Sequence, residues 1–195
     1  MQKKLILASS SKYRKALLEK LFNKLTCDAP MIDERAIDAP TPRELALKLG
    51  ELKAKAIAGK HPTKSIIIAS DQIAMLEGQQ LHKPGNRENN RKQLEACSGK
   101  QVHFFTSVCL LEPESGKTLL ECDETIVTFK DLSNSEIENY VEREPAYDCA
   151  GGFKVEGLGI ALFKSIETED PNALIGLPLI KLCRLLSEFG INPLN

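Results

Sequence analysis

The hydroxyls of Ser9, Ser10 and Ser11 are the first groups in this chain that could bind a ligand, because they lie between a short apolar stretch and a basic one. If the basic stretch opens a helix, its first N–H groups lack internal partners and the helix dipole adds partial positive charge. Arg14 and Lys15 add full charges. This combination predicts an anion site suited to a phosphate. The alternative is a serine cap on a helix whose basic face is solvated.

Asp71 is the sharpest candidate for catalysis. It follows Ser70 and the apolar residues 66–69, which predict a buried strand. Open α/β sheets bind ligands at the carboxyl ends of their strands. A carboxylate held there can take a proton from water or bind a magnesium ion. The alternative role for Asp71 is to cap the turn that follows the strand.

Three further charged residues could join such a site. Glu34, preceded by Asp33, lies in a stretch with no regular pattern, where a solvated loop would explain both carboxylates equally well. Lys53 flanks the apolar stripe of a predicted helix, and it could either extend to water or turn inward to a phosphate. Lys83 precedes Pro84, whose ring stiffens the loop that carries the lysine.

Several familiar kinds of active site are disfavoured by the absence of their motifs. The three histidines lack metal-binding spacing, and the sequence contains no HExxH, GxSxG, GxxxxGK[ST] or GxGxxG segment. What remains is a hydroxyl-rich loop, scattered lysines and arginines, and separated carboxylates. These groups suit a magnesium-assisted attack of water on a polyphosphate, because cations neutralise charge while a carboxylate activates the water.

The elements that must position these residues alternate between strands and helices. Two long strands joined by a turn near Gly116 are expected to be antiparallel neighbours, so the predicted fold class is α/β with a mixed sheet and flanking helices. Capping signals mark several helix starts. The predicted strands are residues 4–8, 65–70, 101–111 and 118–130, and the predicted helices are residues 12–22, 86–97 and those starting at Thr41, Ser133 and Pro178.

Length and composition limit the classes of protein to consider. A chain of 195 residues suits one domain spanning residues 1–195, with room for two lobes around a cleft. A net charge of −1 gives no basic field, so no nucleic-acid partner is expected. No apolar run is long enough for a membrane span, and the apolar stretch after Lys4 is too short for a signal peptide. Six cysteines without paired spacing predict reduced core residues in a cytoplasmic protein.

The chain resembles the Maf family of nucleoside triphosphate pyrophosphatases over nearly its full length. The resemblance implies an ITPase-like α/β fold with two lobes around a deep cleft. It also implies hydrolysis of a nucleotide between its α- and β-phosphates with a divalent cation, Mg²⁺ or Mn²⁺, and it is compatible with a homodimer. The segments that carry it are residues 5–11 with Arg14, 33–34, 53–54, 70–72, 83–84, 98–99, 149–153, 170–172 and 176–178.

The resemblance also assigns roles to individual residues. It makes Asp71 the proton acceptor and places Glu34 on the metal side of the site, with Asp71 able to share the cation. The nucleotide is then the small-molecule partner of the protein. The positions that the resemblance gives to substrate binding are Ser9, Arg14, Lys53 and Lys83.

Within that family, the chain is most similar to the group that acts on 7-methyl-GTP. Gln72 directly after Asp71, and Glu156, are the leading signs. The chain departs from the group at Tyr13, where the group often has tryptophan. A 7-methylated guanine is positively charged, which favours an aromatic face and a nearby carboxylate. Tyr13, Gln72 and Glu156 are therefore expected to set substrate specificity.

Two alternatives stay open at this stage. The enzyme could prefer dTTP, UTP or another modified nucleotide, which changes at the three specificity positions should reveal. The protein could also be a nucleotide-binding regulator of cell division or septum formation, in which hydrolysis is secondary. The sequence favours an enzyme, because a protein that only binds nucleotides needs no carboxylate such as Asp71 beside a phosphate loop.

Overall fold

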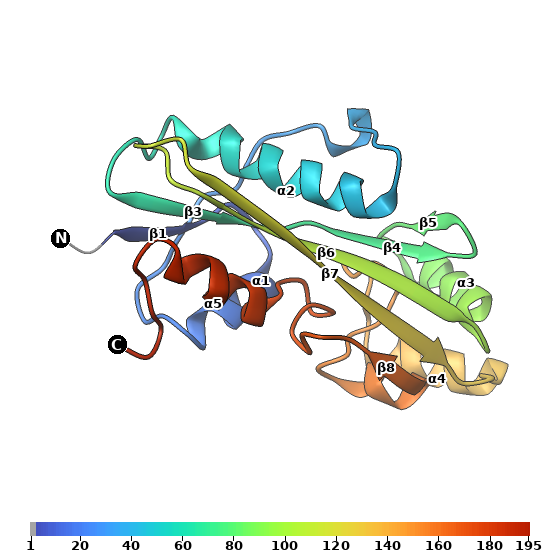
Figure 1. Cartoon of the computed structure of the whole chain (residues 1–195). Coiled ribbons are helices and arrows are strands. Elements are labelled where there is room, and N and C mark those ends of the chain that lie inside the picture. The colour runs from blue at the N-terminus through green and yellow to red at the C-terminus, as the bar shows by residue number, and fades with distance from the viewer. Residues whose placement is uncertain (1–2) are drawn as a thin grey trace. The chain divides into compact units, whose positions relative to one another are not determined.

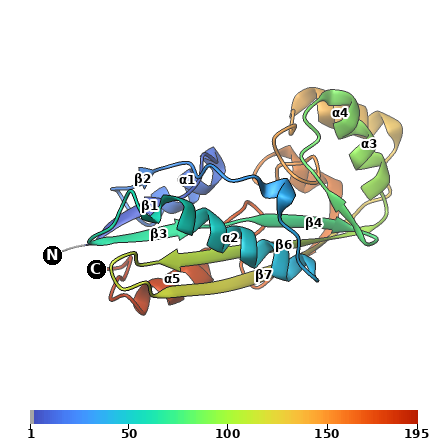
Figure 2. The ribbon, with the colours of Figure 1, turned by 90° about the horizontal axis from the view of Figure 1, so that it is seen from above.

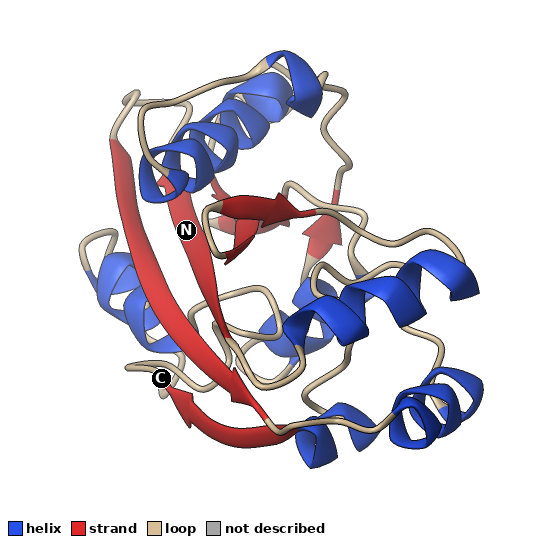
Figure 3. Ribbon diagram, turned by 90° about the vertical axis from the view of Figure 1, so that its right-hand side faces the viewer, coloured by secondary structure: helices blue, strands red, loops and turns tan. Residues whose placement is uncertain are grey.

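The computed structural model describes residues 3–195 of the chain. Within these residues, eight strands form one mixed sheet, accompanied by five α-helices and two short 3₁₀ helices (Figures 1 and 3). The mixed sheet and flanking helices confirm the predicted α/β class. The strands are β1 (Lys4–Leu7), β2 (Thr26–Cys27), β3 (Ser65–Ala69), β4 (Gln72–Leu76), β5 (Gln79–Leu81), β6 (Gln101–Leu111), β7 (Thr118–Phe129) and β8 (Phe163–Glu167). The helices are α1 (Lys12–Glu19), η1 (Glu34–Ala36), α2 (Pro42–Ala58), α3 (Arg87–Cys97), α4 (Asn134–Arg143), η2 (Leu158–Leu162) and α5 (Leu179–Ser187).

The chain divides into two compact units, and β6 and β7 each contribute residues to both. Unit 1 consists of the residues up to Asp71 together with Thr106–Asp123 and Asp170–Asn195. Unit 2 consists of Gln72–Phe105 and Glu124–Glu169. Two units agree with the expected two lobes, whereas the deep cleft stays a prediction.

In unit 1, β1 lies between β2 and β3, and β3 lies next to β6. Strand β1 is parallel to both of its neighbours, whereas β3 and β6 are antiparallel. Leu5 pairs with Ile66, and Ile6 pairs with Ile67. Because side chains alternate between the faces of a sheet, this register gives each face its own apolar set.

Helices cover both faces of the unit 1 sheet (Figures 1 and 2). Leu5 and Leu7 lie on the face that packs against α1 and α5, where Leu17 and Leu182 are buried. Ile6, on the other face, packs against α2. This burial on both faces explains why residues 66–68 form a continuous apolar run rather than an alternating one.

In unit 2, β4 and β5 form a hairpin and β7 pairs antiparallel with β8. Glu77 and Gly78 make the tight hairpin turn with φ angles of 48° and 82°. The core of this unit contains a set of edge-to-face aromatic rings with centroids 4.8–5.7 Å apart. The rings belong to Phe104, Phe129, Phe153 and Phe163.

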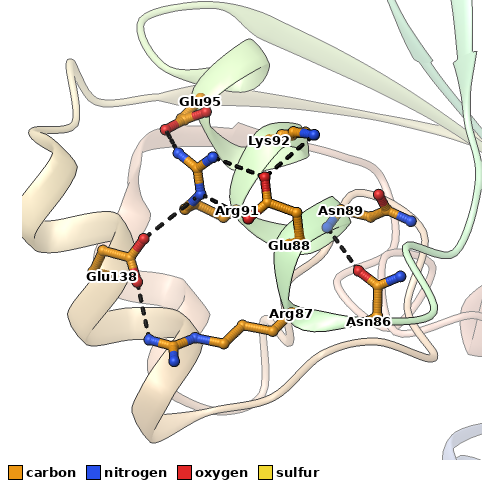
Figure 4. A network of polar contacts seen from close by, with 8 residues as sticks. All are labelled: Asn86, Arg87, Glu88, Asn89, Arg91, Lys92, Glu95 and Glu138. Carbon is orange, nitrogen blue, oxygen red and sulfur yellow. Dashed lines mark hydrogen bonds and ion pairs between the residues drawn. The ribbon is translucent and has the colours of Figure 1, made fainter.

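Helices α3 and α4 of unit 2 are joined by a network of ion pairs (Figure 4). Arg87 binds Glu138 at 3.0 Å, and Arg91 binds Glu138 at 3.6 Å. Arg91 also pairs with Glu88 and Glu95 on its own helix. These side chains are partly or largely exposed, so each pair adds little to stability, and of these pairs only the two with Glu138 link α3 to α4.

The predicted helix starts are confirmed. The Thr41 hydroxyl accepts from the Glu44 N–H at 3.2 Å, and Ser133 and Glu136 form a reciprocal capping box. The first helix is shorter than predicted, because it ends at Glu19 rather than at residue 22. The strands β2, β4, β5 and β8 were not predicted, because each is short and lacks a clear alternating pattern.

The cysteine prediction is partly wrong. Cys97 and Cys109 are buried as expected, but Cys27 is exposed and the other three are half-buried. All six carry free thiols. Among residues 3–195, no helix is both long enough and apolar enough to cross a membrane.

Candidate functional site

The serine loop and Asp71 follow neighbouring parallel strands of unit 1. The N–H of Ala8, just after β1, donates to the carbonyl of Ile68 in β3 at 2.8 Å. Parallel strands end at the same edge of a sheet, so Ser9 and Asp71 lie at one edge, and both are buried. The predicted location at the carboxyl ends of buried strands is confirmed.

Two serine hydroxyls of the loop are engaged in shaping it. Ser11 is the N-cap of α1, and its hydroxyl accepts from the Arg14 N–H at 3.4 Å. The Ser9 hydroxyl accepts from the Ser11 N–H at 3.1 Å. The capping alternative therefore describes Ser11 correctly. The phosphate role of Ser9 stays a prediction, although its hydroxyl hydrogen is not used in this bond.

Lys53 joins the two carboxylates that the sequence singled out. Its Nζ lies 2.5 Å from Oδ1 of Asp71 and 2.9 Å from Oε1 of Glu34. The Lys53 and Asp71 side chains are only 7% and 9% exposed, whereas Glu34 is 52% exposed. Lys53 therefore turns inward rather than extending to water, but its partners here are carboxylates, and its contact with a phosphate stays a prediction.

Local structure explains how Glu34 reaches this lysine. Asp33 caps the short helix η1 by accepting from the Arg35 N–H at 3.2 Å, and Glu34 is the first residue of that helix. Lys53 lies in the fourth turn of α2, on the face that contains the buried residues Leu49 and Ala54. The carboxylate of η1 and the ammonium of α2 thus come together.

Arg14 is fixed to the last segment of unit 1. Its Nε donates to the carbonyl of Gly176 at 2.8 Å, and the buried Ser70 hydroxyl donates to the same oxygen at 2.7 Å. Burial lowers the pKa of the Arg14 guanidinium, and the charges of Asp71 and Glu34 oppose that shift. A guanidinium nevertheless keeps its proton at neutral pH. Arg14 therefore adds a second fixed cation near the two carboxylates.

The charges of this group of four residues balance, since Glu34 and Asp71 cancel Lys53 and Arg14. A polyphosphate added to this neutral set would need further positive charge. Within residues 3–195, no three histidine, cysteine, aspartate or glutamate side chains form a metal cluster. Mg²⁺ does not need one, because it often takes one or two carboxylates together with water and substrate phosphates. The oxygen donors of Glu34 and Asp71 therefore fit a hard divalent cation.

The remaining predicted residues are placed in both units. In unit 1, Tyr13 lies in the first turn of α1, and the Lys12 ammonium lies 5.0 Å from the centre of its ring. In unit 2, Gln72 begins β4, Lys83 is exposed in the loop between β5 and α3, and Glu156 is exposed in a turn before η2. The structure brings Arg14, Lys53, Asp71 and Glu34 together, while the roles of these others stay predictions.

Two residues that support Asp71, one directly and one through the other, were not predicted from the sequence. Ser107 in β6 binds the main chain of Asp71, and Gly50 in α2 lies against the Ser107 hydroxyl. A polar residue inside the apolar run of β6 and a glycine inside a helix were the only signals in the sequence. Neither signal identifies a partner, because the contacts join residues far apart in the chain.

Comparison with known proteins identifies a family and a related sequence. Residues 4–189 match the family model described as Maf-like protein. A protein of Pseudoalteromonas translucida (strain TAC 125), named 7-methyl-GTP pyrophosphatase, is 46% identical over 195 residues, covering 100% of this chain and 96% of that protein. Two solved structures align with 66% of this chain. They are a nucleoside-triphosphatase of Mycobacterium abscessus (TM-score 0.42, 13% identity, 74% of that chain) and the Ham1 protein of Staphylococcus aureus (TM-score 0.48, 16% identity, 73% of that chain).

Proposed function

The chain belongs to the Maf family, and from this premise we propose that it is a nucleoside triphosphate pyrophosphatase that hydrolyses 7-methyl-GTP. The reaction adds water across the α–β phosphoanhydride and releases the nucleoside monophosphate and pyrophosphate. The related protein at 46% identity, named 7-methyl-GTP pyrophosphatase, supports this choice of substrate. Removal of modified nucleotides from the cellular pool is the purpose that we assign to the reaction.

The Glu34–Lys53–Asp71 cluster is the observation that carries the proposal. It places a buried carboxylate at the end of a strand, with its charge held by a lysine at 2.5 Å. In our proposal, Asp71 accepts a proton from the attacking water. Lys53 holds the Asp71 carboxylate in place and stabilises negative charge that develops on the phosphates.

A divalent cation completes the proposed site. Glu34 and Asp71 would hold it through their oxygens, and Mg²⁺ and Mn²⁺ both suit such ligands. When bound, the cation would neutralise phosphate charge and polarise the phosphoryl oxygens. Lys53 is shared by the same two carboxylates, so its ammonium would have to release at least one of them to the cation.

We assign the remaining phosphate contacts to Ser9, Arg14 and Lys83. Arg14 is the best supported of the three, because its Nε bond to Gly176 fixes the guanidinium while other N–H groups of the fork remain. Lys83 is exposed, so its side chain is accessible to a ligand.

For base recognition, we assign roles to Tyr13, Gln72 and Glu156. A positively charged methylguanine would be attracted to the face of the tyrosine ring and to the glutamate. The Lys12 ammonium already lies 5.0 Å from the centre of the Tyr13 ring, so the methylguanine would have to displace it or use the other face. Replacing any of the three should change the preference between 7-methyl-GTP and GTP while pyrophosphate release continues.

The cellular context is part of the same proposal. Six free thiols are typical of a reducing compartment, which supports a cytoplasmic enzyme. The net charge of −1 argues against nucleic acid as a partner. A homodimer is compatible with the family resemblance, and sedimentation of the purified protein would decide between a monomer and a dimer.

The deciding experiment measures pyrophosphate released from 7-methyl-GTP, GTP, dTTP, UTP and CTP in the presence of magnesium. Wild type should prefer 7-methyl-GTP, and Asp71→Asn should lose activity about 10²- to 10⁴-fold. Asp131→Asn is the matched control, because Asp131 also pairs with a lysine, Lys164, at 2.9 Å but is exposed in unit 2. A preference for dTTP or UTP would keep the reaction and reject the specificity assignment. No pyrophosphate from any nucleotide would favour the nucleotide-binding regulator.

A further inference from the structure

Ser107 holds the main chain of Asp71 through its own N–H and its hydroxyl. The Ser107 N–H donates to the Asp71 carbonyl at 2.8 Å, and the Asp71 N–H donates to the Ser107 hydroxyl oxygen at 3.0 Å. That hydroxyl also lies 3.4 Å from the Asp71 carbonyl. Asp71 lies between the end of β3 and the start of β4. Its N–H therefore donates to the side-chain hydroxyl of Ser107 rather than to a main-chain carbonyl of a neighbouring strand. Ser107 is fully buried, and water cannot easily replace it.

Gly50 leaves the space that the Ser107 hydroxyl occupies. A Cβ placed on Gly50 would lie 2.6 Å from Oγ of Ser107, which is too close, but 3.5 Å from its Cβ, which is an ordinary contact. Gly50 is buried in the interior of α2, where alanine would be the better helix former. The glycine is therefore explained by the hydroxyl opposite it.

The same helix carries the cation of the site. Gly50 and Lys53 are three residues apart, so they lie on neighbouring positions of one face of α2. At Gly50, α2 packs against Ser107. Three residues later, the Nζ of Lys53 lies 2.5 Å from Oδ1 of Asp71. Ser107 thus contacts Asp71 directly, and it also lies against Gly50 of the helix that carries Lys53.

We propose that Ser107 is a positioning residue for Asp71, and that Gly50 is the glycine that allows it to act. The proposal rests on the function proposed above, because positioning matters only if Asp71 takes part in the reaction. Without the Ser107 hydroxyl, the Asp71 N–H is buried with no acceptor, and the carboxylate can move relative to Lys53. Displacements of about 1 Å at a reacting group can lower turnover about 100-fold.

The test compares four variants by kcat, KM and thermal midpoint. Ser107→Ala should lower kcat about 10- to 100-fold with KM changed less than about twofold, because ground-state binding does not depend on this contact. Gly50→Ala alone should lower both the thermal midpoint and kcat, because its Cβ collides with the hydroxyl. Ser65→Ala is the matched control, since Ser65 is another buried serine of unit 1, and its hydroxyl donates to the His61 carbonyl at 2.7 Å. Its kcat should equal that of wild type.

The double variant Gly50→Ala/Ser107→Ala separates positioning from packing. Removing the hydroxyl removes the collision, and the new methyl group fills the space, so the thermal midpoint should recover above that of Gly50→Ala. If Ser107 positions Asp71, kcat should stay as low as in Ser107→Ala. Recovery of both the midpoint and kcat would overturn the proposal. Should Ser107→Ala fail to fold, the kcat of the double variant is compared with that of Ser65→Ala instead.

A second readout does not depend on turnover. In wild type, the Asp71 amide proton should exchange slowly with solvent, and Ser107→Ala should speed its exchange at least about 10-fold relative to Ser65→Ala. Unchanged exchange in Ser107→Ala would overturn the proposed contact even in an active enzyme. If wild type releases no pyrophosphate, the proposed reaction fails, and with it the kinetic role of Ser107. The exchange experiment would then show whether the contact exists without that role.

Discussion

Lys53 and Asp71 form a nearly buried ion pair, with Nζ 2.5 Å from Oδ1 and side-chain exposures of 7% and 9%. Such a pair is a weak source of net stability, because both charges lose water when they are buried. Breaking it is costly, since the remaining charge then lacks its partner. The pair is therefore better understood as a device that fixes a carboxylate than as one that stabilises the fold.

The first prediction concerns this pair. Lys53→Met should destabilise the protein by roughly 3 kcal/mol, because it leaves Asp71 as a buried charge without its lysine partner. Lys53→Met/Asp71→Asn should be more stable than Lys53→Met alone, since the buried charge is then gone. Urea unfolding at neutral pH measures both effects. Equal stability of the single and double variants would contradict the assigned geometry.

The second prediction concerns Gly176. Its φ of 127° is a conformation that residues with a side chain rarely adopt, so Gly176→Ala should cost about 1–3 kcal/mol. Because the Gly176 carbonyl holds Arg14, the substitution should also raise KM for the nucleotide. Gly116→Ala is the control, since Gly116 has a φ of 73° and lies in the turn between β6 and β7. It should lose stability without a change in KM.

The third prediction separates the cysteines by reactivity. Burial raises the pKa of Cys97 and of Cys109 to about 12, so at about pH 8 almost no thiolate forms at either. Cys27 is exposed and should react first with a disulfide reagent such as DTNB. Cys27→Ser should remove the fast phase of labelling. A fast phase that survives this substitution would mean that a different cysteine is accessible.

The fourth prediction concerns acid stability. Hydrogen bonds from His61 and then Lys60, at 3.0 and 3.2 Å, lower the pKa of Asp28 below its ordinary value. With the folded pKa below the unfolded one, this contribution to stability is fully present above the unfolded pKa of roughly 3.9. It is lost as the pH falls through the folded pKa. Wild type should therefore be more stable than Asp28→Asn at about pH 5, and the difference should shrink as the pH falls below about 3.9.

Urea midpoints of wild type and Asp28→Asn, measured across this acid range, test the fourth prediction. Comparing the two proteins isolates Asp28, because the other carboxylates titrate in both. A difference that stays constant from about pH 5 to about pH 2 would show that Asp28 does not gain from its partners.

Local sequence was enough to predict the parts of the fold that depend on neighbouring residues. The caps at Thr41 and Ser133 are formed by side chains that bond main-chain N–H groups three residues later. The strand before Asp71 was predicted because burial on both faces leaves an unbroken apolar run. The hairpin of β4 and β5 was missed, although the dipeptide Glu77-Gly78 marks its turn.

The site itself was predictable only in part, for a physical reason. A carboxylate after a buried strand is a local pattern, and it singled out Asp71. The anchors of the site are not local. Ser107 is 36 residues from Asp71, and Gly176 is 162 residues from Arg14. A sequence pattern can show that a serine in an apolar run or a glycine in a helix is unusual. The residue that it contacts can be identified only from the folded structure.

The Gly176 carbonyl also has a consequence for synthesis on the ribosome. The residues that carry charge, Arg14 and Asp71, are made early, whereas the oxygen that fixes Arg14 is added near the end of translation. Both segments of unit 2 are complete before that point. A fragment that terminates before residue 176 would contain the carboxylate and the lysine without the anchor of the arginine. We therefore expect truncated products to be inactive and to be degraded rather than to consume nucleotides.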